Sequence, residues 1–365
     1  MGRRPTSPAE ALCNAGHRPS RPGAAAAARH GLVNSAGRPA ALVALSPSGK
    51  EIPMNAHALQ RSESAHSDIV PGLLRHPASI SPKYFYDERG SELFEEITRL
   101  PEYYPTRTEQ AVMARHGEDI AEAVGAVETV IELGAGNCEK VQPLCRLLRP
   151  QRFVGVDISA DFLRGAVARL QEALPWLQAQ AVAGDLTRPV MLPQDVPRAG
   201  RLVFYPGSSI GNFDPPQALA LLSRMRGLVD RDGGVLIGFD LPKDVAVLEA
   251  AYDDAAGVTA AFNRNALEHV NRLIGSDFVA QDWEHRAFFD RRLSRIEMHL
   301  ETSRGAHVRW PGGGRVFAPG ERIHTENSYK YTLPAFQALL ARAGFSRARV
   351  WTDERGWFAV AYARP

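Results

Sequence analysis

Residues 129–140 read Thr-Val-Ile-Glu-Leu-Gly-Ala-Gly-Asn-Cys-Glu-Lys, an apolar run that passes directly into a loop with two glycines. The run from Thr129 to Leu133 has the length and the β-branched content of a buried strand. Gly134 and Gly136 allow a tight turn after that strand and a close approach of a ligand to the backbone. The segment therefore predicts the first strand of a doubly wound α/β sheet, with a nucleotide-type binding loop at its carboxyl end.

Further apolar or β-branched runs follow, with helical segments between them. The predicted strands are 153–158, 179–183, 201–205 and 234–241. One intervening helix is predicted to follow Ser159 as its N-cap and to end at Pro175. Alternating strands and helices imply right-handed crossovers and hence a parallel sheet. A helix at 333–343 and a closing hairpin of strands at 347–352 and 356–363 are typical of methyltransferases rather than dehydrogenases.

Two helices are predicted ahead of this alternating region. Apolar residues on one helical face predict the first at 93–100. Thr106 and Glu109 have the spacing of a capping box and predict a second helix that runs toward Val124. The sheet is thus expected to carry a helical layer on its N-terminal side.

Composition and length divide the chain into four parts. Residues 1–65 are predicted to be a disordered extension, because the first 53 are rich in Ala, Arg, Pro, Gly and Ser and lack an apolar period. Residues 66–125 are predicted to form a helical layer that contributes to the substrate site. The sheet is assigned to 126–244 and 334–365. Residues 245–333 are too long for a connection and are predicted to form an inserted substrate-binding cap.

Charge and cysteine content exclude several classes of protein. The first 53 residues hold seven Lys and Arg against two Asp and Glu, so the rest of the chain is slightly acidic and does not indicate a nucleic-acid partner. No apolar run approaches the ~20 residues of a membrane span. Cys13, Cys138 and Cys145 lack the spacing of a disulfide framework or a metal site. We therefore expect a cytoplasmic, monomeric protein without a membrane partner, in which Cys138 is a packed thiol rather than a nucleophile.

Residues after the second and third predicted strands narrow the choice of ligand. Asp157 stands 23 residues after Gly134, where an acid can accept hydrogen bonds from both ribose hydroxyls. A nicotinamide-binding loop usually has a third glycine where Glu139 stands. Asp185 can accept from an adenine amino group, and Leu186 can cover the ring. The pattern fits S-adenosylmethionine (SAM) better than NAD.

Small residues follow the fourth predicted strand, from Gly207 to Asn212. In doubly wound folds the reacting centre lies outside the carboxyl ends of the strands, so these residues leave room for a substrate beside the methyl donor. Asn212 offers both a hydrogen-bond donor and an acceptor. The alternative is a Gly-Ser loop in which the asparagine occupies a left-handed turn.

Long strings of this sequence resemble one known family. They are 85–87, 90–107, the loop after Glu132, 207–212, 251–259 with 262–265, and 296–298. In this order they resemble the histidine Nα-methyltransferases that open ergothioneine biosynthesis, over residues 81–363. The resemblance implies a class I SAM-dependent methyltransferase fold, a Rossmann-like sheet with a C-terminal antiparallel hairpin. It also implies threefold methylation of the α-amino group of L-histidine to hercynine.

The resemblance implies roles for individual residues. Those expected to bind SAM are Gly134, Gly136, Lys140, Asp157, Asp185 and Leu186. Those expected to bind histidine are Tyr103, Gly207, Asn212, Tyr252, Met298, Glu326 and Ser328. Tyr86 and Asn212 are the expected catalytic residues beside the amine. Glu326 and Ser328 are two apart on one strand face and can accept from and donate to an imidazole, so Glu326 is the expected specificity residue.

The expected chemistry needs no metal, because displacement at a sulfonium depends on positioning and on an unprotonated amine. An α-ammonium has a pKa near ~8, so it can lose its proton to water or to a tyrosine that can form a phenolate.

Several alternatives stay open at this stage. The chain could methylate another amino acid such as tryptophan, bind an adenosyl group without catalysis, or be a nucleotide-binding dehydrogenase. The Arg-rich, acid-poor first 53 residues leave a targeting segment open as the alternative to a dispensable tail.

Overall fold

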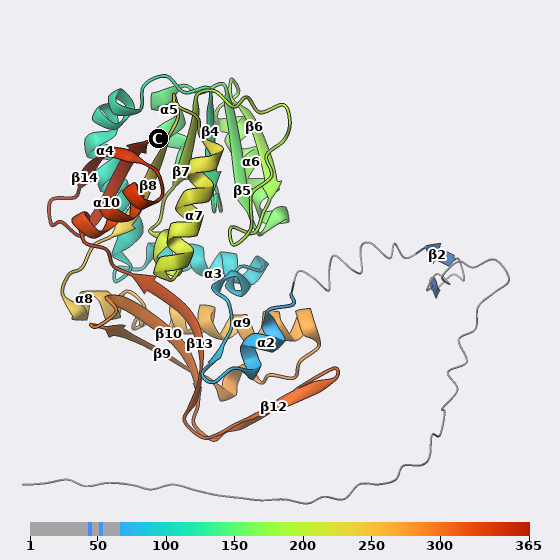
Figure 1. Cartoon of the computed structure of the whole chain (residues 1–365). Coiled ribbons are helices and arrows are strands. Elements are labelled where there is room, and N and C mark those ends of the chain that lie inside the picture. The colour runs from blue at the N-terminus through green and yellow to red at the C-terminus, as the bar shows by residue number, and fades with distance from the viewer. Residues whose placement is uncertain (1–42, 46–50, 54–65) are drawn as a thin grey trace, which may run out of the picture. The chain divides into compact units, whose positions relative to one another are not determined.

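The computed structural model describes residues 43–45, 51–53 and 66–365 (Figure 1). The chain separates into two units, 1–62 and 63–365. In the first unit, strands β1 (Val43–Leu45) and β2 (Glu51–Pro53) pair antiparallel, which the sequence did not predict. The rest of the predicted disordered extension lies outside the described residues.

The second unit contains a seven-stranded sheet in the order β14-β15-β8-β7-β4-β5-β6. Its strands are β4 (Thr129–Leu133), β5 (Arg152–Asp157), β6 (Gln178–Ala183), β7 (Arg201–Tyr205), β8 (Gly234–Asp240), β14 (Ser346–Thr352) and β15 (Phe358–Arg364). Strands β4 to β8 run parallel, whereas β15 pairs antiparallel with β8 and with β14. This topology confirms the predicted class I methyltransferase fold.

Helices cover both faces of this sheet. They are α4 (Tyr104–Val124), α5 (Val141–Leu148), α6 (Ala160–Ala173), α7 (Pro215–Leu228) and α10 (Leu333–Arg342). Alternate residues of β4 enter different cores: Val130 packs with α4, α5 and α6, whereas Ile131 packs with α7 and α10. Every residue of β4 is buried, which explains why the strand reads as one continuous apolar run.

The start of α4 corrects one prediction. The helix begins at Tyr104, with Pro105 in its first turn, where the missing proline N–H leaves no helical hydrogen bond unmade. Thr106 therefore lies inside the helix and is not its N-cap. Glu109 does not close a capping box either; its carboxylate is buried against the sheet. The predicted capping box was wrong, although the helix itself was correct.

The predicted cap contains a second, smaller sheet in the order β3-β13-β10-β9. The elements of this segment are α8 (Val245–Ala250), α9 (Val258–Ile274), η3 (Ala280–Asp282), β9 (Glu284–Asp290), β10 (Arg295–Thr302), β11 (Ala306–Trp310), β12 (Gly313–Phe317) and β13 (Glu321–Tyr329). Strand β3 (Ala78–Ser79) comes from the N-terminal segment and pairs parallel with β13.

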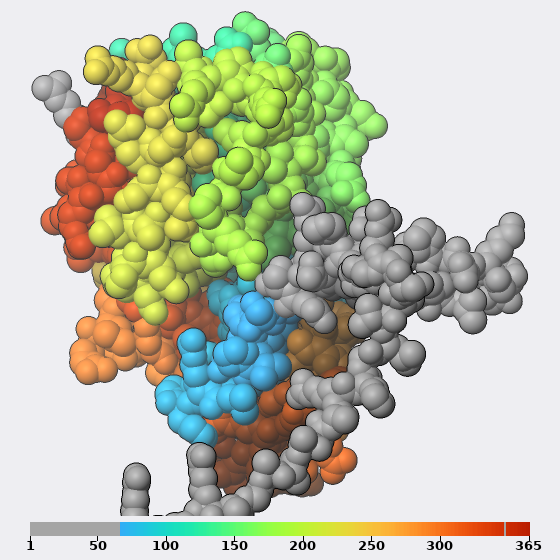
Figure 2. Space-filling model, turned by 45° about the vertical axis from the view of Figure 1, so that its right-hand side comes forward, coloured from blue at the N-terminus to red at the C-terminus, as the bar shows by residue number. Residues whose placement is uncertain are grey.

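The predicted N-terminal layer divides between the two sheets. Its first elements, α2 (Ile69–Leu74), η1 (Pro82–Phe85) and α3 (Glu88–Arg99), share apolar clusters with α9 of the inserted segment. Helix α4 packs on the large sheet instead. In Figure 2 the blue N-terminal segment lies between the green and yellow large-sheet layer and the orange strands. None of the helices in the described ranges has the length and apolar character needed to cross a membrane.

The stacked pair Phe336 and Phe239 offers a test of this core. Their ring centroids lie 3.8 Å apart, and both side chains are fully buried. Phe336→Ala is expected to lower the free energy of unfolding by ~3–5 kcal/mol, because it removes buried apolar area and leaves a cavity. Urea denaturation followed by circular dichroism measures this loss. The control Met191→Ala truncates an exposed side chain, so its free energy of unfolding should stay within ~0.5 kcal/mol of that of the unaltered protein. An equal loss of stability in both variants would contradict the packing described.

Candidate active site

A pocket lies between the two sheets, at the carboxyl end of β7. Its lining includes Tyr86, Tyr103, Gly207, Asn212, Tyr252, Met298, Glu326 and Ser328. The fold therefore brings together all eight residues that were expected to bind histidine or to act on its amine. They come from segments far apart in sequence, on both the large sheet and the inserted segment.

Glu326 and Ser328 form one wall of this pocket from the end of β13. Because side chains alternate along a strand, the two point to the same face. Asn212, in the 3-10 helix η2 (Ser209–Asn212) after β7, donates from Nδ2 to Oε1 of Glu326 at 2.9 Å. Burial raises the pKa of Glu326 to about 8, against the opposing charge of Lys330. With this raised pKa, Glu326 is mostly protonated at neutral pH, and its carbonyl oxygen can still accept a hydrogen bond from a ring N–H.

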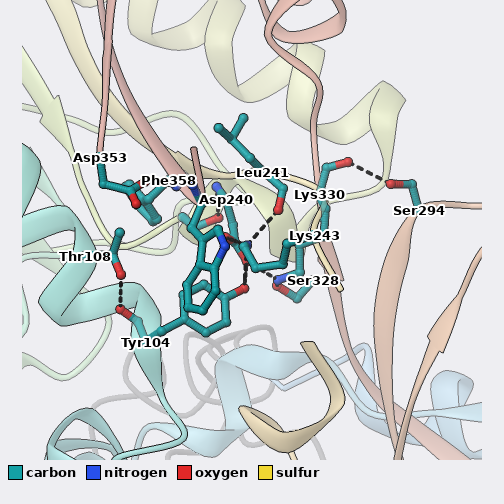
Figure 3. A network of polar contacts seen from close by, with 12 residues as sticks. Tyr104, Thr108, Asp240, Leu241, Lys243, Ser294, Ser328, Lys330, Asp353 and Phe358 are labelled. Carbon is teal, nitrogen blue, oxygen red and sulfur yellow. Dashed lines mark hydrogen bonds and ion pairs between the residues drawn. The ribbon is translucent and has the colours of Figure 1, made fainter. Parts of the chain in front are cut away.

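Tyr252 and Ser328 lie in front of a buried ion network. The Tyr252 hydroxyl and Oγ of Ser328 are 2.7 Å apart. Lys330 donates from Nζ to Ser328 at 2.8 Å and to Tyr252 at 3.2 Å, and it pairs with Oδ2 of Asp240 at 2.8 Å. Figure 3 shows Asp240 held between Lys330 and a second lysine, Lys243, whose Nζ lies 2.5 Å from Oδ1.

Asp240 is ionised despite its burial. Desolvation alone would raise its pKa, but the charges and hydrogen bonds of Lys330 and Lys243 hold the pKa of Asp240 below its ordinary value. Tyr104 on α4 also donates to Oδ2 at 2.5 Å. The network therefore ties β8, β13 and α4 to one carboxylate.

The phenols in the pocket are neutral. Burial raises the pKa of Tyr86, Tyr103 and Tyr252 above the ordinary value. The sequence left open whether a tyrosine could take the amine proton as a phenolate. The raised pKa values disfavour a phenolate at neutral pH, and water is then the better proton acceptor.

Aromatic rings also enclose the pocket on the side of Tyr86. The Tyr86 ring meets Phe94 at 5.7 Å and Phe262 at 5.8 Å, both edge to face. Tyr103 meets Tyr252 at 6.3 Å in the same manner. Aromatic faces attract cations, so this enclosure suits a substrate whose reacting nitrogen gains positive charge.

The glycine loop after β4 fits an adenosyl ligand. Gly134 and Gly136 have φ values of 68° and 51°, in the region that glycine adopts most readily. A Cβ at Gly136 would meet no atom within 4 Å, so the backbone there faces open space. Asp157 accepts from Gly136 N at 3.0 Å through Oδ2 and from Ser159 N at 3.0 Å through Oδ1. The carboxylate is thus fixed beside the loop, as a ribose-binding acid requires.

Cys138 lies in the same loop and is buried, as the sequence predicted. Burial raises the pKa of its thiol, so the thiolate is not available for nucleophilic chemistry.

Asp185 and Leu186 follow β6, as predicted. Oδ1 of Asp185 accepts from the backbone N and the hydroxyl of Thr187, at 2.8 and 2.6 Å. Oδ2 lies 3.3 Å from Nζ of Lys83 in η1, which no sequence pattern had singled out. Although burial opposes ionisation, Thr187 and Lys83 hold the pKa of Asp185 below its ordinary value. Leu186 is half-buried and packs on the large-sheet core.

Glu109 is a site residue that the sequence reasoning missed. Its carboxylate accepts from Gly207 N at 2.8 Å and from Nζ of Lys140 at 2.8 Å. It therefore joins Lys140, after the glycine loop, to the loop after β7. A Cβ at Gly238 would lie 2.1 Å from the Glu109 carboxylate, so β8 needs a glycine there. Gly238, a glycine inside the apolar run of β8, was the signal in the sequence that another group packs closely against this strand.

Glu297, His299 and His324 lie close enough together to hold a metal ion, but Glu297 and His299 flank Met298 and face away from the pocket. Arg295 and Nε2 of His299 already contact the Glu297 carboxylate. The expectation that catalysis needs no metal stays a prediction.

Comparisons with known proteins agree with this site. A family model described as histidine-specific methyltransferase, SAM-dependent, matches residues 65–365. Histidine N-alpha-methyltransferase of Mycolicibacterium smegmatis is 40% identical over 309 residues, covering 83% of this chain and 95% of that protein. The protein of the same name from Mycobacterium tuberculosis is 40% identical over 303 residues, covering 81% and 93%. Ergothioneine biosynthesis protein 1 of Neurospora crassa is 28% identical over 300 residues, covering 79% and 34%. This chain belongs to the family of SAM-dependent, histidine-specific methyltransferases.

Proposed function

We propose that this protein transfers three methyl groups in succession from SAM to the α-amino nitrogen of L-histidine, giving hercynine, the first step of ergothioneine biosynthesis. The observation that carries the proposal is the convergence of Glu326, Ser328, Asn212 and Tyr252 on one pocket at the carboxyl end of the large sheet. The names of the bacterial relatives agree with it.

In this proposal one pair of polar residues binds the imidazole of histidine and a second pair binds its α-carboxylate. Glu326 accepts the imidazole N–H and Ser328 donates to the other ring nitrogen. Asn212 and Tyr252 hold the α-carboxylate through neutral donors. This arrangement disfavours ligands that lack either a ring N–H or a second, accepting ring nitrogen, because they would leave buried polar groups unpaired. Tryptophan has the first but not the second.

The residues expected to hold SAM are the loop glycines and the polar residues at the ends of the neighbouring strands. They are Gly134, Gly136, Lys140, Asp157, Asp185 and Leu186. Bound there, SAM supplies a methyl group on a positively charged sulfur. The aromatic enclosure beside Tyr86 keeps the amine in line and favours the cationic nitrogen that each transfer leaves. Before each of the three transfers the nitrogen gives one proton to water, because the neighbouring phenols stay protonated.

Purified protein incubated with L-histidine and SAM should yield histidine carrying one, two and finally three methyl groups, as measured by mass spectrometry. Tryptophan offered in the same assay should stay unmethylated, and calorimetry with NAD should show no binding. Methylation of tryptophan in place of histidine would overturn the proposal, and so would SAM binding without any methylated product.

Glu326→Ala is expected to weaken histidine binding by roughly 10- to 100-fold, because a buried hydrogen bond to the Glu326 carboxyl group is lost. SAM binding should stay within about twofold, since Glu326 lies on the inserted segment, away from the glycine loop. Isothermal titration calorimetry with each ligand measures both. Glu284→Ala serves as the control, because its exposed carboxylate lies on β9 of the inserted segment and outside the pocket lining. Equal losses for both ligands in Glu326→Ala would contradict the assigned role.

Asp157→Ala is expected to give the reverse pattern. SAM affinity should fall by roughly 10-fold or more, because the ribose hydroxyls lose a charged acceptor and Gly136 N loses its partner. Histidine affinity, measured by the same titration, should change much less. Asp161→Ala, at an exposed carboxylate on α6, is the matched control and should leave both affinities unaltered. A selective loss of histidine binding in Asp157→Ala would count against the donor site described.

A further inference from the structure

Lys330 lies behind the pocket rather than in its lining, yet it contacts two side chains that form the wall. Its side chain has no exposed surface. Its Nζ reaches Ser328 Oγ, the Tyr252 hydroxyl and Oδ2 of Asp240. The ammonium also lies 4.8 Å from the centroid of the Tyr252 ring. Neither the sequence patterns nor the assigned site residues include this lysine.

These contacts fix the direction of the hydrogen bonds at the pocket wall. An ammonium has three donors and no acceptor, and Lys330 has three oxygen partners. The oxygens of Tyr252 and Ser328 therefore both accept from Lys330. The two hydroxyls, 2.7 Å apart, share one hydrogen bond; when each donates to a bound ligand instead, both oxygens still accept from Lys330. The wall is set to donate to a bound ligand.

Both charges of the network act on the pocket: Lys330 lowers the pKa of Glu326, whereas Asp240 raises the pKa of Tyr103 and Tyr252. Asp240 is one carboxylate between two ammonium groups, and all three side chains are almost fully buried. Asp353 adds negative charge on the side of Lys243. Besides Asp240, the acid whose pKa Lys330 lowers is Glu326. Asp240 pairs with Lys330 directly, and within the pocket lining the further anion near Lys330 is an ionised Glu326 or a bound ligand.

We propose that Lys330 is a positioning residue for the amino-acid substrate. It orients the Tyr252 and Ser328 hydroxyls as donors and supplies the positive charge that favours the substrate carboxylate and the ionised form of Glu326. The inference rests on the proposed function, because it takes histidine as the ligand of these hydroxyls.

A pH dependence separates this role from a purely structural one. The titratable groups around Glu326 are the phenols of Tyr86, Tyr103 and Tyr252 and the ammonium of Lys330. The phenols are neutral, so of these four groups Lys330 alone carries charge. Histidine affinity should rise with pH as Glu326 ionises near its pKa of about 8. Without Lys330 the pKa of Glu326 rises further, and this transition moves to higher pH.

The test compares Lys330→Met with the matched control Lys243→Met. Both remove one lysine from the same carboxylate, but Lys243 contacts Tyr104 and Leu241 O rather than the pocket hydroxyls. Burial lowers the pKa of Lys243 to about 8, so Lys243→Met also removes a second group that titrates in the same pH range as Glu326. Lys330→Met leaves Asp240 paired with Lys243 and Tyr104, so the fold should survive. Lys330→Gln keeps N–H donors but removes the positive charge. It is the second variant, used if Lys330→Met fails to fold. Calorimetry with L-histidine and with SAM, from pH 6.5 to about 9.5, gives the affinities.

Lys330→Met is expected to bind histidine roughly 10- to 100-fold more weakly, with its pH transition displaced upward and SAM affinity within about twofold. Lys330→Gln should show the same displacement with a smaller loss of affinity. Lys243→Met should keep the histidine affinity and pH transition of the unaltered enzyme. An equal loss in both methionine variants, or an unmoved transition in Lys330→Met and Lys330→Gln, would overturn the inference alone. An unaltered enzyme that binds no histidine would overturn the proposed function, and this inference with it.

Discussion

One buried carboxylate, Asp240, joins the parts of the fold that make the pocket. It ends β8 of the large sheet and binds Lys330 after β13, Lys243 before α8 and Tyr104 at the start of α4. Its backbone N also donates to Oγ of Ser208, which fixes the loop after β7. Removing one partner of a buried ion pair is far more costly than breaking an exposed one, so these elements hold a single relative position. The pocket depends on that position, because its walls come from both sheets.

The large sheet places the pocket for a topological reason. Strand β4 lies between β5 and β7. The chain adds β5 and β6 on one side of β4 and then crosses over to add β7 and β8 on the other side. Ligands of doubly wound sheets bind at this point, outside the carboxyl ends of the strands. The glycine loop after β4 and the small residues after β7 meet there, and Glu109 connects them by accepting from Lys140 and Gly207.

The sequence predicted the large sheet well because its strands are buried on both faces. Strands β4 and β7 have the predicted bounds, since a fully buried strand reads as an unbroken apolar run. The cap was predicted only as a segment, because β9, β10 and β13 mix buried with partly exposed residues and contain no unbroken apolar run like that of β4. The pocket residues were reached through family resemblance. Glu109 and Lys330 were missed because a single buried charge has no periodicity, and only its partners in space reveal what it does.

The two halves of the site stand on different scaffolds. The glycine loop and its acids belong to the large sheet, whereas Glu326 and Ser328 stand on β13 of the inserted segment. Choice of amino acid and delivery of the methyl group can therefore diverge independently during evolution. A descendant could exchange the residues of β13 for those that fit another side chain and inherit the donor machinery without alteration.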